Sequence, residues 1–246
     1  NWAEPETSLN AANAQIRKQL IAHIREQLNG DEQLLAKVVP SFPPYGKRML
    51  RDGNYYKTLT RDNVELVTGP VKEITTSGVV DADGIEHPAD VIVLATGFLP
   101  QMPLYPMHIV GTRGSIREAW GEDDPRAYLG ITIPHFPNFF VLYGPNTNGG
   151  HGGSAVFNSE CQVRYVMQAV REMVEREAKA LEVRSEPFDA YNQRVDAEHA
   201  QLVWTHPGVK NWYRNKAGRV VTNSPWPLCE YRNLTAAFNP DEYIFK

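Results

Sequence analysis

The sequence predicts an α/β protein, and this interpretation rests on two helical patterns and one strand pattern. Apolar residues recur at three- and four-residue steps over residues 8–28 and 155–178, which places them on one face of a helix. Between these segments, Asp90-Val-Ile-Val-Leu-Ala95 is a continuous apolar run, rich in β-branched residues. Such a run is typical of a strand that is buried on both faces of a sheet, with helices packed against it.

Local signals predict the remaining elements in chain order. A short helix is expected over 31–38, and Pro43-Pro44-Tyr45-Gly46 can only form a loop. Asp81-Ala-Asp-Gly84 predicts a hairpin turn that returns at Ile85. The other strands are expected at 64–67, 71–74, 78–80, 109–110, 128–132 and 139–143. A further helix is expected from Pro187 to about Trp204, and residues 206–246 show no regular pattern.

The long helix expected over 155–178 carries an apolar stripe and an opposite charged face. The stripe consists of Val163, Val166, Met167, Val170, Met173 and Val174. The charged face consists of Arg164, Arg171, Glu172, Glu175 and Arg176. This amphipathic pattern predicts that the stripe packs against the core and that the charged face is solvated.

Composition excludes several functional classes. The 246 residues contain 25 basic and 29 acidic side chains, a net charge of −4, which argues against nucleic acid or an anionic membrane surface as a partner. The longest apolar run, residues 90–96, is far shorter than the roughly 20 residues that cross a bilayer. Two cysteines, Cys161 and Cys229, can form neither a disulfide framework nor a cysteine-rich metal site, and no other spacing of ligand residues predicts a metal. We therefore expect a cytoplasmic protein.

The start of the sequence is also informative. It opens with a polar, acidic segment, Asn-Trp-Ala-Glu-Pro-Glu-Thr, which does not resemble a signal peptide. Residue 1 is Asn rather than Met, so we expect the chain to begin within a longer protein.

Three segments are candidates for chemistry, and each has a structural alternative. Ala95-Thr-Gly-Phe98 follows the expected buried strand, where α/β sheets bind ligands, but the tetrapeptide alone favours a simple turn. Residues 143–155 form a loop of small residues that ends at the N-terminus of a helix, where an anion is favoured. His151 in this loop could titrate, although loop histidines are more often only solvated. Lys47-Arg48 offers an ammonium for a phosphate and a fixed guanidinium for an anionic intermediate, with a surface basic pair as the alternative.

Nine short motifs occur in a defined order along nearly the whole chain. They are Pro43–Arg48, Tyr55-Tyr56, Arg61–Val64, Asp83-Gly84, Asp90–Phe98, Tyr128-Leu-Gly130, Phe136-Pro-Asn138, Gly144-Pro-Asn146 and Trp212-Tyr-Arg-Asn215. In this order they resemble the second half of the flavin-dependent Baeyer–Villiger monooxygenases. Asn223-Ser-Pro-Trp-Pro227 is similar to the branch of 4-hydroxyacetophenone monooxygenase.

The resemblance implies the cofactors FAD and NADPH, and the insertion of one oxygen atom from O₂ next to a ketone or aldehyde carbonyl to give an ester or lactone. Arg48 falls on the family's catalytic arginine, whose fixed charge stabilises anionic oxygen. Lys47 falls on the lysine that meets the 2′-phosphate of NADPH, and Trp212 on a tryptophan near the nicotinamide nucleotide. The segments that close over FAD correspond here to Thr96, Gly97, Phe98, Gly144, Pro145, Asn146 and Ala155.

The sequence also departs from the family pattern. The G-x-G-x-x-G segments for FAD and NADPH lie upstream of the arginine in that family and are not present here. The resemblance therefore implies the C-terminal portion of a Rossmann-like FAD/NAD(P)-binding architecture, inactive as this fragment alone, with the N-terminal half of the same enzyme as its missing partner. Residues 1–95 would end the NADPH-binding domain and residues 96–246 the FAD-binding domain. A flavin monooxygenase that oxygenates nitrogen or sulfur, and a truncated non-catalytic chain, are the alternatives.

Overall fold

The computed structural model describes residues 2–51, 53–150 and 152–246, which fall into two compact units. Unit 1 comprises the residues up to Pro44 and residues 50–98, and unit 2 comprises residues 45–49 and 99–246. The short segment 45–49, which carries Lys47 and Arg48, thus groups with residues that are distant in the sequence rather than with its neighbours.

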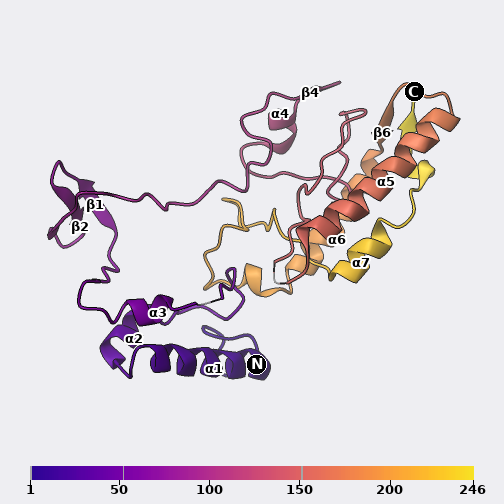
Figure 1. Ribbon diagram of the computed structural model, residues 1–246. Helices are drawn as coiled ribbons and strands as arrows, with labels where there is room; N and C mark the ends of the chain where they lie inside the picture. Colours follow the sequence, from indigo (N-terminus) through magenta and orange to yellow (C-terminus); the bar gives the residue numbers. More distant parts are fainter. Residues whose placement is uncertain (1, 52, 151) are drawn as a thin grey trace. The chain divides into compact units, whose positions relative to one another are not determined.

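Three helices form one part of unit 1: α1 (Ala11–Gln27), α2 (Glu32–Val38) and α3 (Tyr55–Thr58) (Figure 1). The side chains of Asn10 and Asp31 cap α1 and α2, because each accepts a hydrogen bond of 2.9 Å from an amide in the first turn. The helices share a small core around Ile24, Leu28 and Leu35. Both helices expected in this region are confirmed, α1 with a start three residues later than expected.

The second part of unit 1 is a three-stranded antiparallel sheet of β1 (Val71–Ile74), β2 (Gly78–Asp81) and β3 (Glu86–Pro88), in that order. The Asp81 carboxylate accepts hydrogen bonds from the amides of Asp83 (3.0 Å) and Ile85 (2.9 Å), and Gly84 takes a φ of 82°. The predicted hairpin is confirmed. The strand expected at 64–67 is wrong, since those residues have no strand conformation.

The strand expected at 90–95 is also wrong as a buried element. This segment pairs with no strand among the described residues, and Val91, Val93 and Leu94 are 78%, 83% and 72% exposed. A strand is buried on both faces only when neighbouring strands and covering helices are present. The described chain supplies no such neighbours to residues 90–95, so the apolar run is extended and solvated.

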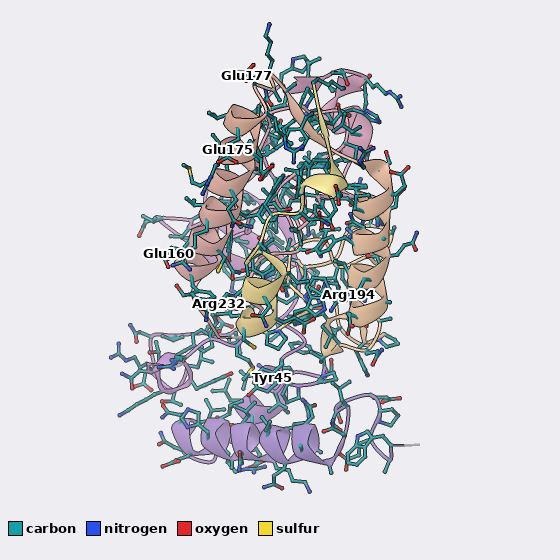
Figure 2. The ribbon with its side chains drawn as sticks, turned by 90° about the vertical axis from the view of Figure 1, so that its right-hand side faces the viewer. Tyr45, Glu160, Glu175, Glu177, Arg194 and Arg232 are labelled. Carbon is teal, nitrogen blue, oxygen red and sulfur yellow. The ribbon has the colours of Figure 1, made fainter. Side chains whose placement is uncertain are left out.

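Unit 2 is built around α5 (Ala155–Glu175), α6 (Ser185–His199) and α7 (Leu228–Leu234). Figure 2 shows α7 between α5 and α6, where Tyr231 of α7 accepts a hydrogen bond from Gln162 of α5 at 2.8 Å, and Arg194 of α6 forms an ion pair with Glu230 of α7. A two-stranded antiparallel ladder of β6 (Leu181–Val183) and β7 (Tyr243–Phe245) packs on the same core. The core residues are Tyr128, Leu129, Ile131, Tyr165, Ala169, Leu181, Val183, Tyr191, Val195, Trp226 and Tyr243.

A second, smaller core lies under a short hairpin of β4 (Val110–Gly111) and β5 (Gly114–Ser115) with helix α4 (Ile116–Trp120). The strands expected at 128–132 and 139–143 are wrong. Only a single bridge joins Tyr128 to Thr132, because Leu129 and Gly130 turn the chain with φ angles of 53° and 69°. In the region without regular pattern, α7, β7 and the 3₁₀ turn Pro240–Glu242 form, and the helix expected to reach Trp204 ends at His199 before a 3₁₀ turn, Val203–Thr205.

The apolar stripe of α5 faces solvent, contrary to the sequence-based expectation. Val163, Met167, Val170 and Val174 are 44%, 59%, 38% and 72% exposed, and only Val166 and Met173 of the stripe pack on the core. The buried face instead carries Asn158, Cys161, Gln162, Tyr165 and Ala169. Polar side chains are tolerated there because they are hydrogen-bonded, Asn158 to Thr147 O at 2.6 Å and Gln162 to Tyr231.

Among the described residues, no helix is both long and apolar enough to span a membrane.

Candidate functional site

Arg48 lies against the glycine-rich loop that leads into α5. Its Nη1 donates hydrogen bonds to the carbonyl oxygens of Gly149 (2.7 Å) and Gly150 (3.0 Å). Both partners belong to unit 2, so the structure brings together two segments that the sequence singled out separately. The bonds fix the end of a long side chain whose charge is permanent.

The segment that carries Arg48 is itself anchored within unit 2. The Asn211 side chain donates hydrogen bonds to the carbonyl oxygens of Gly46 and Trp204, both at 3.1 Å. Tyr45 begins the segment with a positive φ of 69°, which turns the chain toward this anchor. Lys47 and Arg48 are therefore presented from a held loop rather than from a free one.

Close backbone approach explains the glycines of the loop 144–150. A Cβ atom at Gly144 would lie 2.3 Å from the carbonyl oxygen of Gly130, and one at Gly130 would lie 2.1 Å from Thr147 Cγ2. A Cβ atom at Gly150 would lie 2.2 Å from Trp204 Cζ2, so this indole packs directly on the loop. The motifs Tyr128-Leu-Gly130 and Gly144-Pro-Asn146 are thus two halves of one tight contact.

Asn146 has a buried side chain whose hydrogen-bonding groups are all used inside the protein. Its Nδ2 donates to Val220 O (2.8 Å) and Asn223 O (3.2 Å), and its Oδ1 accepts from Arg219 Nη2 (3.1 Å). Only 2% of the residue is exposed. A contact between Asn146 and a cofactor would therefore involve its backbone.

The loop ends at the N-terminus of α5. Ser154 caps the helix by accepting a hydrogen bond from the Phe157 amide at 3.3 Å, and Ala155 is the first helical residue. Gly152 and Gly153 precede the cap with φ angles of 79° and 83°. This helix end favours negative charge nearby. His151, the candidate titrating group of this loop, lies outside the described residues.

Lys47 and Trp212, both expected to contact NADPH, line one cavity of about 610 Å³. Gln101 holds the Trp212 backbone by donating to its carbonyl oxygen at 2.7 Å. The sequence-based reasoning missed two further cations in this wall, Lys210 and Lys216, and assigned no role to a third, Arg214, although it lies in the motif at 212–215. The alternation of basic and aromatic residues around Trp212 was the signal that could have revealed them. A cavity with several cations and an exposed indole edge suits a phosphorylated nucleotide.

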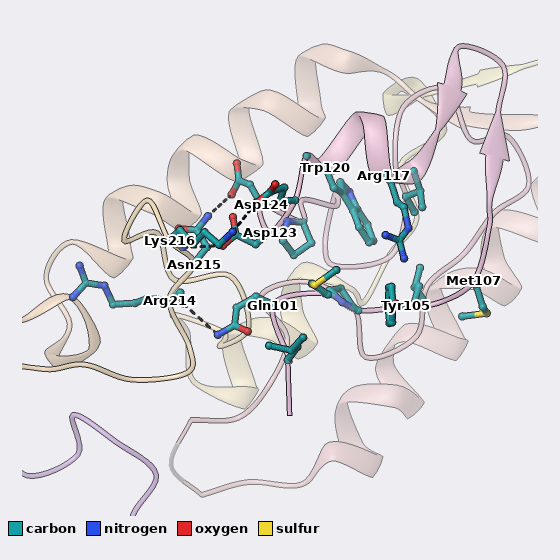
Figure 3. A pocket seen from close by; sticks show the side chains of 18 residues that line it. Gln101, Tyr105, Met107, Arg117, Trp120, Asp123, Asp124, Arg214, Asn215 and Lys216 are labelled. Carbon is teal, nitrogen blue, oxygen red and sulfur yellow. Dashed lines mark hydrogen bonds and ion pairs between the residues drawn. The ribbon is translucent and has the colours of Figure 1, made fainter. Parts of the chain in front are cut away.

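A neighbouring cavity of about 590 Å³ shares Arg214, Asn215 and Lys216 with the first. Figure 3 shows Trp120, Arg117 and Tyr105 at one end of this cavity and Asp123, Asp124 and Lys216 at the other. The Arg117 guanidinium lies 4.5 Å from the centre of the Tyr105 ring. Of the segments singled out in the sequence, only Trp212-Tyr-Arg-Asn215 contributes to this cavity, through Arg214 and Asn215.

Thr96, Gly97 and Phe98 belong to unit 1 and lie in the extended, exposed segment that follows residues 90–95. Gly97 has a φ of 86°, and Phe98 is 97% exposed. Exposed apolar surface of this kind is typical of sites where other protein or a ligand binds.

His199 of α6 lies beneath the loop. Its Nε2 is 3.0 Å from Asn223 O, and the residue is 2% exposed. Burial lowers the pKa of His199 to about 4, partly opposed by its hydrogen bond to Asn223. The imidazole is therefore neutral at physiological pH and serves as a fixed hydrogen-bond donor.

Comparison with known proteins identifies relatives of this arrangement, although no protein-family model matches the chain. An uncharacterised monooxygenase of Sinorhizobium fredii is 41% identical over 98% of this chain and 37% of its own length. A Baeyer–Villiger monooxygenase of Pseudomonas aeruginosa is 34% identical over 93% of this chain and 43% of its own length. The chain thus spans less than half of the curated relatives it matches.

Solved structures also match this chain over nearly its whole length. The structure of OTEMO in complex with FAD and NADP matches with a TM-score of 0.85 and 27% identity, over 97% of this chain and 45% of that one. Cyclohexanone monooxygenase from Rhodococcus sp. Phi1 bound to NADP⁺ matches with a TM-score of 0.81 and 29% identity, over 98% and 46%. These matches confirm the predicted fold class, a partial FAD/NAD(P)-binding α/β architecture. Over nearly its whole length this chain is homologous to part of the Baeyer–Villiger monooxygenases, and the family predicted from its sequence is confirmed.

Proposed function

We propose that the chain is the C-terminal portion of an FAD- and NADPH-dependent Baeyer–Villiger monooxygenase that inserts one oxygen atom from O₂ next to a ketone or aldehyde carbonyl. The observation that carries the proposal is Arg48, held by Gly149 and Gly150 on the loop before α5. The relatives named above support the reaction class, and the motif at 223–227 makes aryl ketones the first substrates to test.

The residues present fit parts of both cofactors. Lys47, Lys210 and Lys216 beside Trp212 provide the charge and the ring expected of an NADPH site. The N-terminus of α5, with Gly152 and Gly153 before it, suits the electron-rich edge of reduced FAD. Thr96, Gly97, Phe98, Gly144, Pro145, Asn146 and Ala155 are proposed to complete the FAD contacts.

Arg48 supplies the electrostatic part of the reaction. FAD, when bound, provides O₂ activation, and NADPH provides the reducing equivalents. The guanidinium cannot lose its proton at neutral pH, so its charge stabilises negative charge as it develops on the carbonyl oxygen of the substrate. Its bonds to two carbonyl oxygens hold it in place before the substrate arrives, which avoids the cost of ordering it during the reaction.

The working enzyme includes further polypeptide. Two apolar surfaces support this part of the proposal, residues 91–94 in unit 1 and the α5 stripe of Val163, Met167, Val170 and Val174 in unit 2. We propose that the N-terminal half of the same enzyme covers both. Residues 1–95 would then end the NADPH-binding domain and residues 96–246 the FAD-binding domain, in a cytoplasmic enzyme.

The decisive experiment uses the full polypeptide that contains this chain. Arg48→Ala is expected to oxidise NADPH at near the wild-type rate while ester formation is lost. Arg51→Ala, which removes the same charge from an exposed position three residues away, is the matched control and retains ester formation. Ester yield at the wild-type level from Arg48→Ala would refute the assignment, and sulfoxide from a thioether without ester from any ketone would favour the alternative flavin monooxygenase.

A second measurement tests the need for the other half. The purified 246-residue chain is expected to carry no bound flavin, because the pyrophosphate-binding G-x-G-x-x-G segments supply most of the cofactor affinity. A yellow chain with flavin absorbance would contradict this expectation.

A further inference from the structure

We propose that Arg219 is a positioning residue that holds the loop 144–150 through Asn146 and thereby fixes Arg48. The inference rests on the proposed function for its catalytic consequence, and its structural consequence can be measured separately.

Arg219 is a nearly buried guanidinium with partners on three sides. Its Nε donates to Asp196 Oδ1 at 2.7 Å, and its Nη1 donates to Asp124 Oδ1 and to Pro125 O, both at 3.2 Å. Its Nη2 donates to Asn146 Oδ1 at 3.1 Å. The Arg219 side chain is only 10% exposed, whereas its two carboxylate partners, Asp124 and Asp196, are partly exposed. The guanidinium thus connects α6 and the segment 124–125 to Asn146.

Asn146 passes this constraint to the loop. Besides its own side-chain bonds to residues 220 and 223, its amide donates to Val221 O at 3.1 Å, and the Asn148 amide donates to Thr222 O at 3.0 Å. The Ser224 amide returns a bond to Asn148 O at 2.8 Å. Hydrogen bonds therefore hold the loop against residues 220–224 as far as Asn148, the residue before Gly149.

Gly149 and Gly150 come next, and their carbonyl oxygens hold Arg48. A shift of the loop would move both acceptors together. Displacement of a reacting group by about 1 Å can cost up to a hundredfold in rate, so a buried residue without contact to Arg48 can still control it.

The chain provides a matched control in Arg126. It binds the same two carboxylates, Asp124 through Nε at 2.9 Å and Asp196 through Nη1 at 3.0 Å. Among the described residues it makes no hydrogen bond to Asn146. Loss of either arginine weakens the ion cluster, but only loss of Arg219 removes the connection to the loop.

The first test measures amide hydrogen exchange at Asn146 and Asn148 in the full polypeptide. Arg219→Gln is expected to speed exchange at these amides by about tenfold or more, because opening of the loop becomes easier. Arg126→Gln is expected to leave them at wild-type rates. Arg219→Lys keeps the charge between the carboxylates but cannot reach all four acceptors, so it is expected to restore stability while exchange in the loop remains fast.

The second test measures ester formed per NADPH oxidised. Arg219→Gln and Arg219→Lys are expected to lower this ratio by about tenfold with the KM for NADPH unchanged, and Arg126→Gln to preserve it. Equal exchange in the Arg126 and Arg219 variants, or wild-type exchange in Arg219→Lys, would overturn the positioning role. A wild-type enzyme that forms no oxygenated product from any carbonyl would instead refute the proposed function and leave the exchange result to decide this inference.

Discussion

Replacing Gly144 by Ala tests whether close backbone contact shapes the loop that holds Arg48. The added Cβ would lie 2.3 Å from Gly130 O, 3.0 Å from Val141 Cγ1 and 3.2 Å from the Gly130 carbonyl carbon. An ordinary carbon–oxygen contact is about 3.3–3.6 Å, so the backbone carbonyl must retreat by about 1 Å. Because the obstacle is backbone rather than a flexible side chain, the cost should fall at the upper end of the overpacking range, about 3 kcal/mol.

The assay combines stability with coupling in the full polypeptide. Gly144→Ala is expected to lower Tm by several degrees and to reduce the ester formed per NADPH oxidised, because the shifted loop displaces the acceptors of Arg48. Gly69→Ala is the control, since its Cβ would meet only Ala82 Cβ at an ordinary 3.7 Å. If Gly144→Ala had the same Tm and the same ester formed per NADPH oxidised as Gly69→Ala, the argument from backbone contact would be refuted.

The remaining predictions concern pH, cofactor binding and the exposed helix face. The free energy of unfolding should fall by up to about 3 kcal/mol as the pH drops from 6.5 to about 4, because His199 takes up a proton in the unfolded chain while the buried imidazole stays neutral. In His199→Gln, the free energy of unfolding, measured by denaturant titration at each pH, should vary less over this range. An unchanged pH dependence in this variant would contradict the prediction. Lys47→Ala and Lys210→Ala should raise the KM for NADPH much more than the KM for NADH, measured by steady-state oxidation, and equal increases for both would argue against phosphate recognition in this cavity. Val174→Lys should destabilise the full polypeptide but leave the melting of the 246-residue chain unchanged, because in our proposal only the longer protein would cover this position; equal effects on both proteins would count against the proposed covering interface.

Local elements could be predicted from the sequence because their signals lie within a few residues. The helices expected over 8–28 and 31–38 both form, and Asp81 with Gly84 specifies the expected hairpin through bonds inside the turn. The ordered motifs were sufficient to predict the family, which the comparisons confirm.

Burial could not be predicted from the same patterns. The apolar run at 90–95 and the stripe of α5 both read as core, yet Val93 is 83% exposed and Val174 is 72% exposed. Whether an apolar face is buried depends on which elements are available to cover it, and the local sequence does not contain that information. The two predictions of burial, for the strand at 90–95 and for the apolar stripe of α5, are wrong for this same reason.

The sequence by itself determined the residue types on which the chemistry depends: an arginine and a lysine on a proline-rich loop, a glycine-rich approach to a helix, and the order of both. Only the tertiary structure decided that Arg48 binds the carbonyl oxygens of Gly149 and Gly150, and that Arg219 reaches the same loop through Asn146. These contacts join residues about a hundred and about seventy positions apart. Hydrogen bonds of this kind depend on how distant segments pack, so no pattern confined to either segment can specify them.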